Sequence, residues 1–310
     1  MTATKSGGGR TEHAAERFFA IDGHRIVARP LAAGLYVVAT PIGNLGDISL
    51  RALATLAAAD VIACEDTRVT AVLLRRYGIL TPLVAYHDHN AARQRPKLIA
   101  ALAEGKRIAL VSDAGTPLIS DPGYKLVKEA RDAGHAVVPV PGASAVLAGL
   151  VAAGLPTDSF LFAGFLPPKS AARRTRLAEL KAVPATLVFY ETGPRLAAAL
   201  ADMAAVLSDD RPATIARELT KVFETVVSGT LGGLAETYAA DDPPKGEIVV
   251  LVGPPMAPAP SAEDADRLLA ELLKDKSLSQ AVAEAANLTG RKRRDLYQRA
   301  LKLKDDDGNG

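Results

Sequence analysis

The 310-residue sequence has a single cysteine, no tryptophan and no long apolar run. One cysteine, Cys64, excludes an internal disulfide and is typical of a protein kept in a reducing compartment. No apolar run is long enough to span a membrane, and the first thirty-odd residues carry charges throughout, without the apolar segment of a signal peptide. We therefore expect a soluble, cytoplasmic protein.

The sequence also lacks a marked excess of either charge. Lys and Arg total 37 against 35 Asp and Glu, a net charge of +2, which does not by itself indicate a nucleic-acid partner. Any basic surface must therefore be local. Hydrophobic residues make up 48% of the chain, enough for two domains with cores of their own.

The order of apolar runs predicts an α/β protein of several parts. Residues 1–33 are Gly-rich and predict a flexible tail. In residues 34–155, short apolar runs alternate with helical stretches, which favours a parallel sheet covered on both faces. In residues 156–253 strands outnumber helices and Gly229 resembles a hairpin turn, which predicts a mixed α+β sheet. A proline-rich link leads to a small helical basic extension, residues 261–304, with a break at Gly290.

Four loops of unusual composition follow predicted strands: ATPIGNLGD, CEDTR, SDAGTPLISDPG and VPVPGASA. In an open parallel sheet, ligands bind beyond the carboxyl ends of the strands, where such loops converge. Glycine lets the backbone approach a ligand and proline fixes the turn, so these loops suit an amino acid and a nucleoside better than a triphosphate. No P-loop motif is present. A dinucleotide site is the alternative, because Glu65 and Asp66 follow the first loop at about the ribose-binding spacing.

Cysteine and histidine chemistry is not favoured. Cys64 lies in an apolar strand, which predicts a buried structural thiol. His87 and His89 could ligate a metal, but no further ligand cluster accompanies them, and we predict no metal site.

Taken together and in order, the four loops, followed by VFYE, RELTK and KGE, resemble the ribosomal RNA small subunit methyltransferase I family of the tetrapyrrole methylase superfamily. The resemblance covers residues 35–252, and the helical extension fits it too. It implies a two-domain tetrapyrrole-methylase-like fold and 2′-O-methylation of a cytidine in the decoding region of 16S rRNA. It further implies a homodimer that binds S-adenosylmethionine between the two domains and acts on 16S rRNA or the small ribosomal subunit.

The resemblance also implies which residues bind the cofactor. One group in the first domain would contact its methionine part, and a second group in the other domain would hold its adenosine. The first group is Pro41, Gly43, Asp113, Gly115, Ser144 and Ala145, and the second is Tyr190, Lys245 and Gly246.

Methyl transfer from a sulfonium is an in-line displacement that needs no metal, and most of the catalysis is positioning. A ribose hydroxyl is a weak acid, so a base or a cation must assist the loss of its proton. In ARELTKVFE, read as a strand with alternating faces, Lys221 is the catalytic candidate and Glu218 its orienting partner. A surface ion pair or a phosphate contact explains the same charges equally well.

Two basic clusters are candidates for RNA contact, together with Arg68 of CEDTR. Cations at a helix N-terminus oppose the helix dipole, a penalty that bound phosphates would reverse. The tail also scans as a helix-turn-helix. The first cluster comprises Lys169, Arg173, Arg174 and Arg176, and the second comprises Arg291, Arg293 and Arg294.

Two other functions stay open. One is a methyltransferase acting on a small tetrapyrrole-like acceptor, because related porphyrinoid methylases place similar loops around the same cofactor. The other is a nucleic-acid-binding regulator with a degenerate core.

Overall fold

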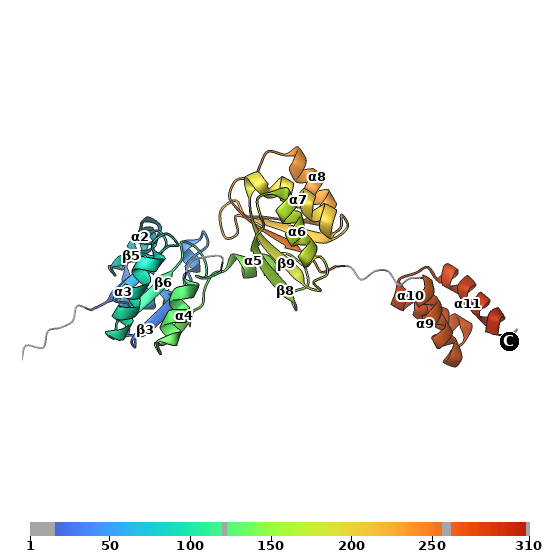
Figure 1. Ribbon diagram of the computed structural model, residues 1–310, viewed down its shortest axis with the longest axis horizontal. Helices are drawn as coiled ribbons and strands as arrows, with labels where there is room; N and C mark the ends of the chain where they lie inside the picture. The colour runs from blue at the N-terminus through green and yellow to red at the C-terminus, as the bar shows by residue number, and fades with distance from the viewer. Residues whose placement is uncertain (1–15, 120–122, 256–261, 308–310) are drawn as a thin grey trace, which may run out of the picture. The chain divides into compact units, whose positions relative to one another are not determined.

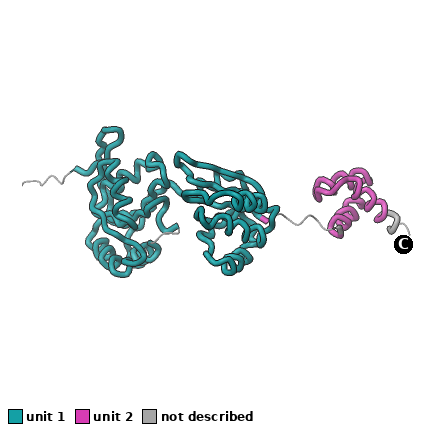
Figure 2. Tube along the Cα trace, turned by 90° about the horizontal axis from the view of Figure 1, so that it is seen from above, with its two compact units in different colours: residues 1–254 teal, residues 255–310 magenta. Residues whose placement is uncertain are grey.

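The computed structural model describes residues 16–119, 123–255 and 262–307. The chain divides into two compact units, Met1–Pro254 and Pro255–Gly310 (Figure 2). The first unit contains two sheets, and we call the parts built on them the N-lobe and the C-lobe. No helix of the described residues is long and apolar enough to cross a membrane.

The N-lobe is built on a parallel sheet, as the sequence predicts (Figure 1). Its strands lie in the order β5-β4-β6-β3-β7, and each neighbouring pair is parallel. The first strand of this sheet along the chain, β3, therefore lies between the last two, β6 and β7, so the loops that leave these three strands emerge side by side. The strands are β3 (Gly34–Val38), β4 (Val61–Cys64), β5 (Leu83–Ala85), β6 (Arg107–Val111) and β7 (Val137–Val140).

Helices cover both faces of this sheet because its strands are apolar on both sides. Tyr36 and Val38 belong to the apolar cluster that α1 and α2 cover, whereas Leu35 belongs to the cluster beneath α3 and α4. This alternation is the period of two expected for a strand. The remaining N-lobe elements are η1 (Leu45–Asp47), α1 (Leu50–Ala58), α2 (Thr67–Arg76), α3 (Ala91–Ala103) and α4 (Tyr124–Asp132).

A hairpin precedes the parallel sheet, and it corrects the expectation of a flexible tail over residues 1–33. Residues 1–15 lie outside the described residues, but β1 (Phe18–Ile21) and β2 (His24–Val27) pair antiparallel. Asp22 and Gly23 both have positive φ, as a two-residue hairpin turn requires. Phe19 is buried in the same core cluster as Tyr36.

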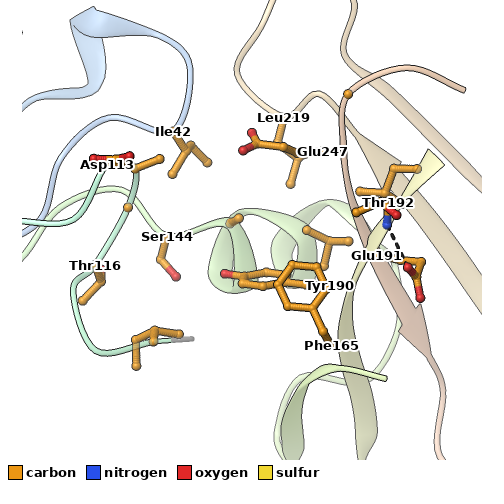
Figure 3. Close-up of a pocket in the computed structure, with 17 residues that line it drawn as sticks. Ile42, Asp113, Thr116, Ser144, Phe165, Tyr190, Glu191, Thr192, Leu219 and Glu247 are labelled. Carbon is orange, nitrogen blue, oxygen red and sulfur yellow. Dashed lines mark hydrogen bonds between the residues drawn. The ribbon is translucent and has the colours of Figure 1, made fainter. Parts of the chain in front are cut away.

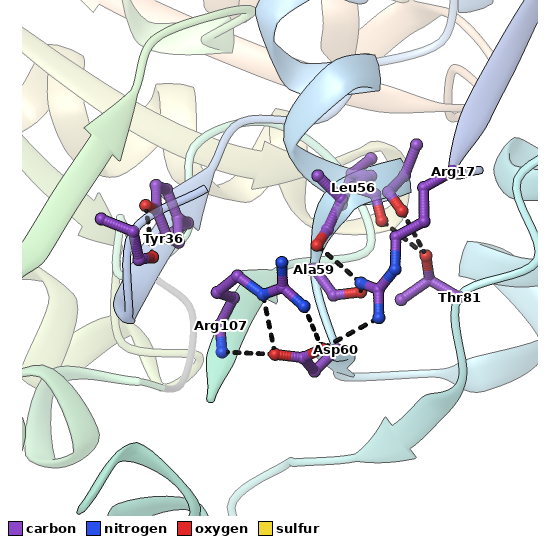
Figure 4. Close-up of polar contacts among 10 residues, drawn as sticks. Arg17, Tyr36, Leu56, Ala59, Asp60, Thr81 and Arg107 are labelled. Carbon is purple, nitrogen blue, oxygen red and sulfur yellow. Dashed lines mark hydrogen bonds and ion pairs between the residues drawn. The ribbon is translucent and has the colours of Figure 1, made fainter. Parts of the chain in front are cut away.

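Asp60 fixes this hairpin to the sheet (Figure 4). Its carboxylate accepts hydrogen bonds from the guanidinium and backbone N–H of Arg107 and pairs with Arg17 at 2.9 Å. Arg17 also donates to the carbonyls of Ala58 and Ala59, at the end of α1. The hydrogen bonds from Arg107 hold the pKa of Asp60 well below its usual range.

The C-lobe contains the predicted mixed sheet, in the order β11-β10-β12-β9-β8, with only the β8–β9 pair parallel among its described strands. Gly229 lies inside β11, opposite Ala213, so its prediction as a hairpin turn is wrong; the β10–β11 connection is residues 218–224. The strands are β8 (Phe160–Phe165), β9 (Thr186–Thr192), β10 (Pro212–Arg217), β11 (Thr225–Thr230) and β12 (Glu247–Val252).

The two faces of this sheet have different partners. Leu187 and Phe189 pack in the cluster formed with α6 (Ser170–Leu180), α7 (Gly193–Leu207) and α8 (Leu231–Ala240). Val188 and Tyr190 lie on the other face with α5 (Ala145–Ala152). Since α5 follows the last N-lobe strand, this packing joins the two lobes.

The second unit is a helical bundle with its own core. Its helices are α9 (Ala262–Asp275), α10 (Leu278–Thr289) and α11 (Arg293–Asp307). A capping box at Ser277 begins α10, and Gly290, in the left-handed conformation, ends it where the sequence predicts a break. Leu269, Val282 and Leu296 contribute one buried side chain from each helix.

Candidate functional site

Three loops of the N-lobe are tied together at the carboxyl edge of the parallel sheet. Thr40, after β3, forms an isolated β-bridge with Gly115, after β6. The hydroxyl of Thr116 donates to the carbonyl of Ala143, after β7, at 3.1 Å. The Asp113 carboxylate accepts a hydrogen bond from the backbone N–H of Asp66 at 2.9 Å, which adds the CEDTR loop. The four loops therefore converge, as the sequence predicts.

A cavity of about 390 Å³ lies between these loops and the C-lobe (Figure 3). Asp113 and Ile42 lie on one side of it, and Leu219 and Glu247 on the other. Its remaining walls come from the N-terminus of α5 and from β9 and β12. The lining residues are Ile42, Asp113–Thr116, Ile119, Ser144, Ala145, Phe165, Tyr190–Thr192, Leu219 and Gly246–Val249.

One end of this first cavity suits an amino acid. Ser144 precedes α5 without a side-chain capping bond, and Ser144 and Ala145, at the N-terminus of that helix, line the cavity. A helix N-terminus attracts a carboxylate. The Asp113 carboxylate, close by on the β6 loop, suits an ammonium group.

The other end suits an aromatic base. Tyr190 packs edge-to-face against Phe162 and Phe165, with ring centroids 4.8 and 5.5 Å apart. Figure 3 shows the rings of Tyr190 and Phe165 together along one wall. Ile248 and Val249 continue that wall, so a nucleoside would lie against apolar side chains.

A second cavity, of about 380 Å³, adjoins the first. The two share Ile42, Asp113, Ala114 and Glu247. The other walls of the second cavity come from the β3 loop, from α2 and from Lys221 of the C-lobe. These residues are Thr40, Pro41, Gly43, Leu45, Val69, Thr70, Val72, Leu73, Ser112 and Lys221.

An ion cluster stands where the cavities meet. The Lys221 ammonium lies 2.7 Å from Glu218 Oε1 and 2.9 Å from Glu247 Oε2. Glu218 Oε1 also accepts the backbone N–H of Glu247 at 3.0 Å. The expected strand alternation through ARELTKVFE is wrong beyond Arg217, because β10 ends there and Glu218 and Thr220 have positive φ. This turn, and not a strand, brings Lys221 back onto Glu218.

The cluster holds Lys221 and Glu218 in their charged forms. Burial alone would lower the pKa of Lys221, but its hydrogen bonds with Glu218 and Glu247 outweigh burial and raise that pKa. The hydrogen bond from Lys221 lowers the pKa of Glu218. Lys221 is therefore an ammonium ion at neutral pH.

Two glycines make room for this cluster. A Cβ atom on Gly43 would lie 2.4 Å from Lys221 Cγ, and one on Gly246 would lie 2.3 Å from Glu218 Oε1. Both glycines have φ in the left-handed region, at +145° and +98°. Gly43 belongs to the N-lobe, so Lys221 packs across the boundary between the lobes.

Most of the predicted cofactor residues lie in these cavities. Pro41 and Gly43 line only the second cavity, and Lys245 lines neither. Glu247, which lines both, was not predicted, although it follows Lys245 and Gly246 directly in the sequence. The predicted residues that line the first cavity are Asp113, Gly115, Ser144, Ala145, Tyr190 and Gly246.

The predicted RNA-binding residues divide into two groups. Arg173 is 4% exposed and donates to Asp202 and to the carbonyls of Pro168 and Ala198. Its assignment to RNA contact is therefore wrong, because its guanidinium is committed to the C-lobe interior. The others lie on the surface or partly so: Arg68, Lys169, Arg174, Arg293 and Arg294 are exposed, and Arg291 is partly buried.

The remaining predictions from the sequence concern the single cysteine and a metal site. Cys64 is fully buried, as predicted, and burial raises the pKa of its thiol. Among the described residues, no group of three or more His, Cys, Asp and Glu side chains is arranged to hold a metal ion.

Comparison with known proteins identifies the family. The model of the Tetrapyrrole (Corrin/Porphyrin) Methylases matches residues 34–235, and the RsmI C-terminal HTH domain matches residues 259–304. The chain is 60% identical to the ribosomal RNA small subunit methyltransferase I of Mesorhizobium japonicum over 92% of this chain and 97% of that protein. The chain belongs to the ribosomal RNA small subunit methyltransferase I family. The Escherichia coli O157:H7 member is 49% identical over 86% of this chain and 94% of its own length.

A solved structure supports the fold of the family. The uroporphyrin-III C-methyl transferase from Thermus thermophilus, complexed with S-adenyl homocysteine, superimposes with a TM-score of 0.50. It is 21% identical and covers 70% of this chain and 96% of its own. The expected tetrapyrrole-methylase fold is thereby confirmed.

Proposed function

We propose that this member of the family transfers the methyl group of S-adenosylmethionine to the 2′-hydroxyl of a cytidine in the decoding region of 16S rRNA. The observation that carries the proposal is the Lys221 ion cluster at the junction of two adjoining cavities. A group-transfer enzyme needs such a junction, because donor and acceptor must meet beside the group that stabilises the developing charge.

The first cavity fits the donor. Asp113 would hold the α-ammonium group, the N-terminus of α5 at Ser144 and Ala145 the carboxylate, and Tyr190 with Ile248 the adenosine. Bound S-adenosylmethionine would supply a methyl group on a sulfonium that is already an activated leaving group.

Lys221 acts as a cation and not as a base. Its pKa is raised, so very little neutral amine exists at neutral pH to accept a proton. As an ammonium it stabilises the alkoxide that develops on the ribose oxygen. Glu247 lines both cavities, orients Lys221 and takes the proton. Glu218 is the positioning residue that holds Lys221 in place.

The second unit supplies RNA affinity. Arg293 and Arg294 are exposed at the beginning of α11, where they can meet phosphates. We further propose that the protein works as a homodimer in the cytoplasm, where small ribosomal subunits are present. Light scattering on the purified protein tests the dimer.

The deciding experiment uses small ribosomal subunits from a strain that lacks its own copy of this methyltransferase. The protein and labelled S-adenosylmethionine are added, and the label is mapped by nuclease digestion and mass spectrometry. One labelled cytidine ribose is expected. If no label enters RNA although the protein binds the cofactor, the RNA assignment is wrong and a tetrapyrrole-like acceptor becomes the leading alternative.

A charge variant separates RNA binding from donor binding. Arg293→Glu is expected to weaken binding to the small subunit and to leave the affinity for S-adenosylhomocysteine unchanged, because Arg293 lies in the second unit. Equal subunit binding by the variant and the parent would show that the beginning of α11 does not contact RNA.

A further inference from the structure

The second cavity has a chemistry that donor binding does not explain. Val69, Val72 and Leu45 line it while remaining 45%, 56% and 37% exposed. Val69 and Val72 lie one turn apart on α2 and are exposed, whereas Leu73, which also lines the cavity, and Leu74 are buried, so the two valines are not part of the buried core. Apolar side chains left open inside a cavity suit a flat apolar ligand face.

The same cavity also has ionic side chains in its wall. These are Lys221 and Glu247, and Glu247 also faces the first cavity. A ligand that lies against Val69 and Val72 therefore reaches the ion cluster with its polar end. A nucleoside has both kinds of surface, because its base is flat and aromatic and its ribose carries hydroxyl groups.

The outer surface of α2 is basic around this opening. Arg68, Val72, Arg75 and Arg76 follow the spacing of one helical face, and all four are exposed. Arg68 pairs with Asp66 but remains 88% exposed. Cations one turn before and one turn after the apolar wall match the phosphates on either side of a nucleotide.

We propose that the second cavity binds a single nucleotide of the acceptor RNA, rotated out of its base stack. Its base lies against Leu45, Val69 and Val72, and its ribose hydroxyl reaches Lys221 and Glu247 at the boundary with the donor cavity. The flanking phosphates contact the arginines of α2. This inference rests on the proposed RNA methylation and assigns to it an acceptor site. Enzymes that react with a base rotate it out of the stack into a pocket whose apolar side chains replace part of the lost stacking, and we extend this to a nucleotide whose ribose hydroxyl has to reach the ion cluster between the lobes.

Val72→Asp tests the wall, because it places a carboxylate against the base and beside the phosphates. We expect kcat/KM for small subunits to fall at least about tenfold, while the Kd for S-adenosylhomocysteine changes less than about twofold. Leu80→Asp is the matched control: Leu80 is 87% exposed, lies just beyond α2 and lines neither cavity.

A fluorescent base reports the rotation directly. A decoding-region RNA carries pyrrolocytidine at the methylated position and is added to protein loaded with S-adenosylhomocysteine. Fluorescence should rise with the parent and with Leu80→Asp, and should not rise with Val72→Asp. The proposal is wrong if Val72→Asp matches Leu80→Asp in kcat/KM, or if the parent binds this RNA without a fluorescence change. Failure of the parent to methylate any RNA is a different result, which overturns the proposed function itself.

Discussion

Replacing Lys221 by methionine tests the ion cluster most directly. Methionine keeps the length of the side chain but removes the ammonium that lies 2.7 Å from Glu218 and 2.9 Å from Glu247. Loss of one donor that stabilises a developing oxyanion costs about 100- to 1000-fold in turnover. The Lys221 side chain is 28% exposed, so water screens part of its charge and the lower end, about 100-fold, is expected.

The assay is single-turnover methylation of small subunits at saturating S-adenosylmethionine. Lys128→Met is the matched control, because Lys128 is exposed on α4 and pairs only with Asp132 among the described contacts. The control should keep the parent rate, and both variants should bind S-adenosylhomocysteine like the parent. A rate for Lys221→Met within about twofold of the parent would refute the role of the cluster.

The pH dependence separates a cation from a base. The pKa of Lys221 is raised above its usual value near 10.5. If its neutral amine took the proton, the rate would rise about tenfold per pH unit between pH 7 and 9, in proportion to the neutral fraction. With Lys221 as a cation, no such rise is expected over this range, because the neutral fraction of Lys221 then does not set the rate. A tenfold rise per unit would restore Lys221 as the base.

Three further predictions concern binding and stability. Asp113→Ala should weaken S-adenosylhomocysteine binding about tenfold in calorimetry, because the variant loses a charge-assisted hydrogen bond to the ligand. Unchanged affinity would show that the donor does not bind next to Asp113. Asp60→Asn should lower the free energy of unfolding by about 2 kcal/mol at pH 7, against under about 0.5 kcal/mol for the exposed Asp132→Asn. Because the folded pKa of Asp60 is depressed, its stabilisation is complete above the unfolded pKa near 3.9 and disappears as pH falls through the folded value, so the gap between parent and Asp60→Asn should close in acid. Arg173→Met should cost about 3 kcal/mol, because it removes the guanidinium that lies 2.7 Å from the buried Asp202 carboxylate and leaves it only Ser170 and the more distant Arg174. Subunit binding by the folded protein should not change, and weaker RNA binding without loss of stability would return Arg173 to the RNA surface.

Sheet geometry predicts that the loops of the site converge, and the family resemblance supplies the individual residues in them. Asp113 and Ser144 lie in loops that leave β6 and β7, the parallel strands on either side of β3, and loops at the same edge of such a sheet converge. Tyr190 came from the family resemblance, and the alternation of β9 explains why it faces the donor cavity while Phe189 enters the helical core.

The errors concern long-range contacts and local turn chemistry. Arg173 lies in a basic run that resembles a surface patch, and its burial depends on Asp202, 29 residues away. The pairing of Glu247 with Lys221 depends equally on a turn that reverses the chain after β10. The β1–β2 hairpin did have a local signal, because Asp22-Gly23 between two apolar runs is typical of a two-residue turn.

The ion cluster also explains why the two cavities must act as one site. Lys221 comes from the C-lobe and packs against Gly43 of the N-lobe, while Glu247 forms part of the wall of both cavities. A shift of the β3 loop at Gly43 would therefore displace Lys221, the proposed catalytic ammonium, and Leu45 of the proposed acceptor wall. In-line transfer tolerates misplacement of the reacting atoms poorly, since an error of about 1 Å can cost about 100-fold in rate. Position 43 therefore needs glycine for two reasons: its backbone has a positive φ, and a side chain there would collide with Lys221. In the proposed mechanism, this contact between the lobes aligns the acceptor with the donor.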